Sequence, residues 1–193
     1  MHPSLFFRPG ALLSQPELGA ARIDGVLIEV GEGYMPPDLP EDDAARARSL
    51  SPVLVSGYAL SGPSAAWVHG AGDAPPIRHH LQRIGAHRPR VERALNVVLH
   101  ERTTAAGDIE LIDDVPVTTR VRTLVDLVLG ADADESTAEW MHRLAATAPE
   151  LVPQVRGILA SRHRMPGKRA ALARIDELER ELEPQEEVTR YTS

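Results

Sequence analysis

The sequence contains no cysteine, few aromatic residues and no long hydrophobic run. Without cysteine the chain has no disulfide, no thiolate metal ligand and no cysteine nucleophile, as is usual for proteins of a reducing compartment. The N-terminus has no basic flank followed by an apolar segment, so we expect no signal peptide. No apolar stretch approaches the roughly 20 residues that span a bilayer. The sequence therefore predicts a soluble, cytoplasmic protein with no membrane contact.

Aromatic residues make up 4% of the 193 residues, whereas hydrophobic residues make up 42%. The core must therefore be built from leucine, valine, isoleucine and alanine. A chain of this length forms one domain, or one domain with a small appendage. Its net charge of −7 argues against a protein that binds polyanions over its whole surface.

Charge is segregated along the chain. Residues 1–45 carry a net charge of −6, residues 78–90 carry +4 and residues 151–174 carry +6, and neither basic block contains an acid. Residues 175–187 return to −6. Such blocks predict where a polyanion can dock and where it is repelled.

The N-terminal part predicts a small helix and a hairpin. Ser14 and Pro16 are typical of a helix start, here over residues 15–21, and a Gly-Glu-Gly turn separates the apolar segments 26–30 and 34–35. A further helix is expected over residues 41–49. We expect residues 1–36 to pack on the rest of the molecule through Leu13, Leu18, Val26, Ile28 and Tyr34.

The remainder predicts strands in the middle and helices at the end. A helix capped by Ser61 or Ser64 precedes the strands expected over residues 94–100 and 108–114, while residues 78–84 fit either a strand or a helix. Helices are expected over residues 136–147, 150–161 and 167–182. This order indicates an α+β fold with a small mixed sheet in the middle and a helical C-terminal part.

Residues 108–129 predict a strand followed by an amphipathic helix. Pro116 removes a ladder donor and should end the strand, after which Thr118 or Thr119 can cap the helix. Arg122 and Asp126 stand four residues apart and should form a salt bridge on the helix surface. Arg120 should reach a carbonyl or carboxylate at the strand end. The residues of this corner to which we assign a structural role are Thr118, Arg120, Arg122 and Asp126.

The sequence offers no convincing catalytic or metal site. His79 and His80 are adjacent and would point to opposite faces of a strand, as would Asp113 and Asp114. His69 stands at a helix C-terminus, where the dipole favours an imidazolium. No Gly-x-Ser-x-Gly elbow and no glycine-rich phosphate loop occurs. We therefore expect no catalytic residue, no metal and no cofactor.

The two basic blocks are the candidate binding surfaces. Guanidinium groups bind phosphates with two parallel hydrogen bonds, so arginines without nearby acids favour nucleic-acid contact. The alternative is a solvated surface neutralised by the acidic segments, which is about equally compatible with the sequence. The candidate nucleic-acid-binding residues are Arg162, Arg164, Lys168 and Arg169 in the second block, which we favour, and Arg78 and Arg83 in the first.

Several segments together resemble the AbiEi family, which contains antitoxins and autoregulatory repressors of type IV toxin–antitoxin systems. These are the Ser-Gly-Pro-Ser-Ala-Ala segment from Ser61, the two strands at 95–100 and 109–113, and a Pro-Val-Thr plus Arg-Thr-Leu-Val-Asp-Leu signature within residues 116–127. The basic tail at 168–173 is also similar. The resemblance covers about residues 50–180.

The resemblance implies an N-terminal winged helix-turn-helix that binds operator DNA, followed by an antitoxin domain. Only residues 19–24 separate the expected helix from the hairpin, so this unit would be a reduced winged helix. The implied division is a winged-helix-like unit and linker helix over residues 1–49, an AbiEi-like domain over 50–183 and a tail over 184–193. The implied partners are a nucleotidyltransferase-like toxin and DNA or RNA.

Three functions remain open from the sequence. The first is a non-enzymatic regulator or antitoxin that binds a toxin or a nucleic acid. The second is a relative that processes nucleic acid enzymatically, although no carboxylate–lysine motif on strands supports it. The third is a protein-interaction module without a nucleic-acid role, which the net charge of −7 favours.

Overall fold

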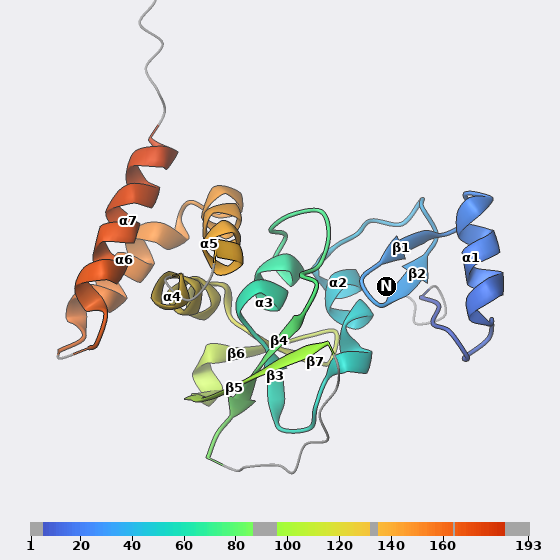
Figure 1. Cartoon of the computed structure of the whole chain (residues 1–193), viewed down its shortest axis with the longest axis horizontal. Helices are drawn as coiled ribbons and strands as arrows, with labels where there is room; N and C mark the ends of the chain where they lie inside the picture. Colours follow the sequence, from blue (N-terminus) through green and yellow to red (C-terminus); the bar gives the residue numbers. More distant parts are fainter. Residues whose placement is uncertain (1–5, 87–95, 132–134, 164, 184–193) are drawn as a thin grey trace, which may run out of the picture.

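The computed structural model describes residues 6–86, 96–131, 135–163 and 165–183, and its fold is α+β, as predicted. Figure 1 shows α1 at one end of the molecule, the five-stranded sheet in the middle and α6 and α7 at the other end. The helices are α1 (Gln15–Ile23), α2 (Asp43–Ser49), α3 (Gly62–Val68), α4 (Arg120–Gly130), α5 (Glu135–Thr147), α6 (Leu151–Ser161) and α7 (Lys168–Leu182). The strands are β1 (Ile28–Val30), β2 (Gly33–Met35), β3 (Tyr58–Leu60), β4 (His79–Ile84), β5 (Val97–Thr104), β6 (Ile109–Ile112) and β7 (Val115–Thr118).

The N-terminal unit consists of α1 and the antiparallel β1–β2 hairpin, which confirms the predicted helix and hairpin. Glu17 closes a capping box at the start of α1, because its carboxylate accepts hydrogen bonds from the amide and hydroxyl of Ser14, both at 2.7 Å. Leu18, Leu27 and Tyr34 form a small core of their own. This core is separate from the main one.

The expected packing of the N-terminal unit is only partly correct. Ile28 does contact the main core, whereas Leu13 and Tyr34 belong to the small core. The prediction that Val26 packs on the rest of the molecule is wrong. Its side chain is 62% exposed, because Val26 lies in the turn between α1 and β1 rather than on the hairpin. A hydrogen bond of 2.9 Å between Glu32 and His79 of β4 joins the hairpin to the sheet instead.

The main sheet has the strand order β5-β4-β3-β7-β6. Its central strand, β3, was not predicted; it pairs antiparallel with β4 and parallel with β7. Residues 79–84, which fitted a strand or a helix, form the strand β4, which pairs parallel with β5. The predicted strand over 94–100 begins at Val97 in the described residues and runs on to Thr104.

The expected strand end at Pro116 is wrong. Strand β6 ends at Ile112, and a two-residue turn at Asp113 and Asp114 leads into β7, which contains Pro116 and pairs antiparallel with β6. Asp113 and Asp114 have φ angles of 50° and 64°, the left-handed conformation that a tight hairpin turn requires and that aspartate tolerates. The two carboxylates therefore stand in a turn, not on opposite faces of a strand.

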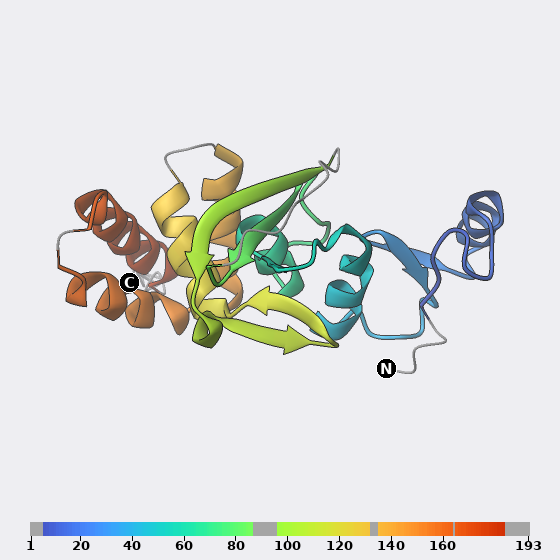
Figure 2. The ribbon, with the colours of Figure 1, turned by 90° about the horizontal axis from the view of Figure 1, so that it is seen from below.

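Helices α3 and α4 pack together beside the sheet, and α5, α6 and α7 pack on them in turn. Figure 2, seen from below, shows the strands in front of α3, with α6 and α7 beside them at the left. The largest fully buried side chains at this centre include those of Trp67, Leu60, Leu81, Leu124 and Leu144. The predicted C-terminal helices are thus confirmed within about one residue at their starts and ends.

The main core continues across the expected boundary at residue 49. Ala45 and Ala47 of α2 are fully buried in it, together with residues of the sheet and of α7 such as Ile175. The helix that was expected to act as a linker is therefore part of the main body. Within the described ranges, no helix is both long enough and apolar enough to cross a membrane.

Candidate functional site

The corner between β7 and α4 is built by threonine hydroxyls. The Thr119 side chain accepts a hydrogen bond from the amide of Arg122, at 3.3 Å, and so caps α4 as expected. Thr118 is fully buried, and its hydroxyl lies 2.7 Å from that of Thr123. The hydroxyl of Thr123 also donates to the carbonyl of Thr118 at 3.1 Å. This network fixes the direction in which α4 leaves the sheet.

The expected pair of Arg122 and Asp126 is present and has two parallel hydrogen bonds, both of 2.8 Å. The side chains are only 14% and 13% exposed. Burial raises the pKa of Asp126 and outweighs the hydrogen bonds and charge of Arg122 that lower it. Arg122 also lies 3.4 Å from Asp108, and its guanidinium plane is therefore fixed between two carboxylates.

Arg120 forms an ion pair, but not with the strand end as expected. Its guanidinium lies 2.6 Å from the carboxylate of Asp43 in the first turn of α2. The contact therefore joins α4 to α2 rather than to the strand end. Both side chains are about 40% exposed, so the pair contributes at most about 1 kcal/mol.

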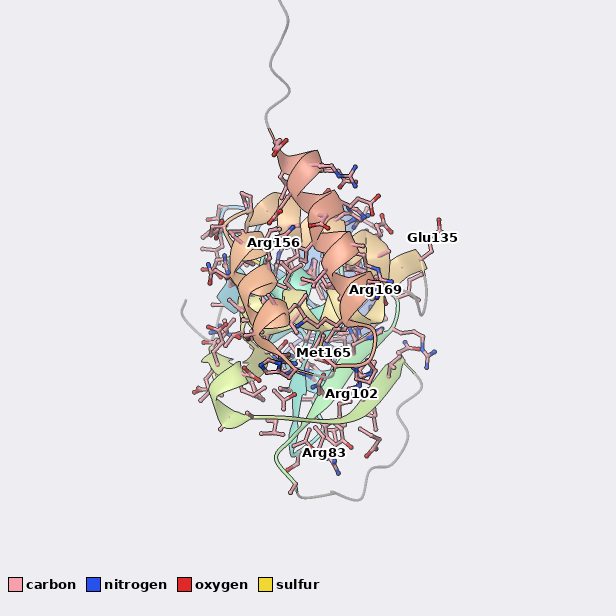
Figure 3. All side chains as sticks on the ribbon, turned by 90° about the vertical axis from the view of Figure 1, so that its left-hand side faces the viewer. Arg83, Arg102, Glu135, Arg156, Met165 and Arg169 are labelled. Atoms are coloured by element: carbon pink, nitrogen blue, oxygen red, sulfur yellow. The ribbon has the colours of Figure 1, made fainter. Side chains whose placement is uncertain are left out.

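A cleft of about 450 Å³ opens beside the Arg122–Asp126 pair. Its walls come from three segments distant in sequence: the end of β5, the outer face of α4 and the link between α6 and α7. Figure 3 shows Arg102 of β5 and Met165 of the link next to each other at the lower end of the α6–α7 hairpin. The polar lining residues are Arg102, Thr103, Arg122, Asp126 and Arg162, and the apolar ones are Leu129, Met165 and Pro166.

Two of the three arginines in the cleft are available to a ligand. Among the described residues, the guanidinium groups of Arg102 and Arg162 form no hydrogen bond or ion pair, and both residues are exposed. Arg102 is close enough to Asp126 for its charge to act on the carboxylate, but the Arg122 pair already occupies that carboxylate. Among the described residues that line the cleft, one guanidinium is therefore paired with a carboxylate and two are not.

Of the candidate residues in the second basic block that the structure describes, only Arg162 lines the cleft. Arg162 lines the cleft, whereas the ammonium of Lys168 donates to the carbonyls of Ala160 and Arg162, both at 2.7 Å. Lys168 thereby closes the C-terminal end of α6. Arg169 is exposed on α7 and does not line the cleft, and Arg164 lies outside the described residues.

The first basic block contributes only indirectly. Arg83 donates to the carbonyl of Glu101 and to the hydroxyl of Thr103, both at 3.0 Å, and its side chain is 14% exposed. It therefore supports the strand that carries Arg102. Arg78 is exposed in the loop before β4 and does not line the cleft.

Two histidines stand next to the cleft. His80 Nδ1 and His100 Nε2 are 3.0 Å apart, and burial lowers the pKa of His100, although Asp126 opposes this. The expected imidazolium at His69 is wrong, because the side chain is 2% exposed and burial lowers its pKa. In the part of the chain that is described, no three histidine or acidic side chains are arranged to hold a metal ion.

Sequence reasoning missed Arg102, Thr103 and Met165 as cleft residues. Arg102 stands alone between Glu101 and two threonines, so a search for runs of basic residues passes over it. The strand that carries it was expected to end at His100. Its place in the cleft depends on the length of β5 and on the packing of the α6–α7 link, neither of which a local pattern reveals.

Comparison with known proteins adds little to this geometry. No family model and no curated protein matches the chain. The chain is similar to a solved structure, the crystal structure of the RV2827C protein from Mycobacterium tuberculosis, with 20% sequence identity and a TM-score of 0.44. The match covers 87% of this chain and 65% of that one. A likeness this low carries no argument about function, and the AbiEi resemblance stays a prediction.

Proposed function

We propose that the protein is a non-enzymatic regulator of the AbiEi-like type and that it binds nucleic acid through the arginine-lined cleft. The observation that carries this proposal is the meeting of Arg102 and Arg162 in one cleft, from segments sixty residues apart, without a carboxylate partner among the described residues. Guanidinium groups with no internal acceptor are suited to phosphate oxygens.

The Arg122–Asp126 pair supports this use of the cleft. Because Asp126 fixes the Arg122 side chain, less side-chain entropy is lost when a phosphate approaches that guanidinium. The carboxylate also reduces the positive charge of the cleft. We therefore expect moderate, strongly salt-dependent affinity rather than tight binding, and the net charge of −7 acts in the same direction.

The test is the salt dependence of nucleic-acid affinity, measured by fluorescence anisotropy on the full chain. Each lost phosphate contact should reduce the slope of log affinity against log salt by about 0.7 for a single strand and about 0.9 for a duplex. We expect Arg102→Gln and Arg162→Gln each to do so. The matched control is Arg22→Gln, which removes the same charge from α1 at the far end of the molecule and should leave the slope unchanged.

Two further variants separate this cleft from the basic block seen in the sequence. Lys168→Gln and Arg169→Gln should change the slope less than the two cleft variants, because neither side chain lines the cleft. A slope that falls with Arg169→Gln but not with Arg102→Gln would place the contact along α7 and contradict the proposal.

A protein partner is the second candidate, because the N-terminal unit exposes apolar side chains. Leu12, Ile23 and Val26 are 81%, 80% and 62% exposed. The family resemblance implies a nucleotidyltransferase-like toxin as the partner. Co-expression with a toxin encoded by the adjacent gene should yield a stable complex that Ile23→Glu disrupts while Arg102→Gln leaves it intact.

A further inference from the structure

The walls of the cleft differ in chemistry, and this difference points to a more specific ligand. Arg102, Arg122 and Arg162 provide cations, whereas Leu129, Met165 and Pro166 provide an apolar surface beside them. A ligand that satisfies both carries a phosphate next to an apolar, planar or ring-shaped group. We propose that the cleft binds one nucleotide of a single-stranded nucleic acid, with its phosphate on the arginines and its base or sugar against Met165.

This proposal rests on the proposed function and adds strand selectivity to it. In a duplex the bases are stacked and paired, so a protein can reach the sugar–phosphate backbone and the base edges but not a base face. A single strand can turn an unstacked base toward an apolar wall. An apolar wall beside the arginines is therefore useful only for a single strand.

The size of the cleft agrees with this ligand. Its volume of about 450 Å³ lies within the range of about 300–1,000 Å³ that is typical of small-molecule sites. Side chains from β5, α4 and the α6–α7 link line it and leave it open to solvent, so one nucleotide of a longer strand can reach it.

Two residues of the cleft, Thr103 and Met165, have side chains that can contact such a ligand. The Thr103 hydroxyl oxygen accepts a hydrogen bond from Arg83 at 3.0 Å, which leaves its own proton to donate to a phosphate oxygen. Met165 is only partly buried, packs against the main core and has an unbranched side chain that adapts to a ring placed against it. In this account Arg83 is a positioning residue, because it acts through Thr103.

The experiment compares three fluorescent ligands of equal length on the full chain: oligothymidylate, an abasic strand and a blunt duplex. We expect oligothymidylate to bind most tightly. Met165→Ser should weaken it by about two- to tenfold, the size of a methionine–ring contact, and should leave the abasic strand unchanged. An oligouridylate arm then assigns the preferred sugar. Leu12→Ser, which removes an exposed apolar side chain near α1, is the control and should have no effect.

The outcomes separate this inference from the proposed function. Duplex affinity equal to or above that of oligothymidylate overturns the inference, and so does equal weakening of the strand with and without bases by Met165→Ser. Either result leaves nucleic-acid binding intact if Arg102→Gln still lowers the salt slope. If Arg102→Gln and Arg162→Gln change nothing for any ligand, the proposed function itself fails.

Discussion

Replacing Asp126 with alanine removes the carboxylate that holds Arg122 and should destabilise the fold while strengthening anion binding. Breaking a fully buried ion pair costs about 3–5 kcal/mol because the remaining charge has lost its partner. Here both side chains are 13–14% exposed, and Asp108 remains 3.4 Å from Arg122. We therefore expect a loss of about 2–3 kcal/mol, or roughly 5–10 °C in melting temperature for a domain of this size.

The assay is denaturant unfolding of Asp126→Ala, Arg122→Leu and the double variant. In a double-mutant cycle the double variant should be less destabilised than the sum of the single variants, by about 1–3 kcal/mol, because Arg122→Leu removes the charge that Asp126→Ala leaves unpaired. Asp126→Asn should be milder than alanine, since its amide oxygen can still accept one hydrogen bond from Arg122.

Binding should change in the opposite direction. Loss of one negative charge beside the phosphate site contributes about 1 kcal/mol at a few ångströms in water, which is about fivefold in affinity. A variant of unchanged stability would refute the view that the Arg122–Asp126 pair supports the fold. A folded variant that binds nucleic acid less tightly would refute the view that Asp126 limits affinity by reducing the charge of the cleft.

Three other predictions concern stability. Gly31→Ala should cost about 1–3 kcal/mol in a thermal melt, because φ is +54° and a Cβ atom would lie 2.2 Å from the Ser49 hydroxyl; combining it with Ser49→Ala should recover part of the loss. Lys168→Met should cost about 1 kcal/mol through the two hydrogen bonds that it removes at the end of α6, as measured by denaturant unfolding. Burial lowers the pKa of His69 below its ordinary value of 6.5, so the unfolded chain binds more protons and stability should fall as the pH drops below about 6.5, by up to about 1.4 kcal/mol per pH unit. His69→Gln should reduce that slope.

The helices of this protein could be predicted from the sequence better than its strands. Apolar side chains at helical spacing and residues such as Thr119 and Gly167 mark the long helices clearly. Strand β3 has three residues, all buried, and so shows no alternation of polar and apolar positions. A central strand this short can be recognised only from its pairing with β4 and β7 in the folded sheet, not from its sequence.

The turn at Asp113 and Asp114 shows a second limit. Pro116 was expected to end a strand, since it lacks a ladder donor, yet the chain had already turned at the two aspartates. Aspartate adopts the left-handed conformation less readily than glycine or asparagine does. An Asp-Asp pair in a sequence is therefore a weak signal of a hairpin turn.

The charge pattern of the sequence predicts the lining of the cleft only in part. Runs of basic residues in the sequence pointed to the α6–α7 link, where Arg162 lines the cleft. They also suggested Lys168, whose ammonium caps α6, and Arg83, which supports β5. Charge runs identify arginines that are neighbours along the chain, whereas Arg102 and Arg162 are brought together only by tertiary packing.

The most direct test of the central claim uses the methionine methyl groups. The chain has four methionines, of which Met35 and Met141 are buried and Met165 lines the cleft. A titration of methyl-labelled protein with oligothymidylate, followed by nuclear magnetic resonance and assigned with Met165→Leu, should shift the Met165 signal and leave those of Met35 and Met141 in place. Saturable binding that leaves the Met165 signal unmoved would contradict a nucleic-acid site in this cleft.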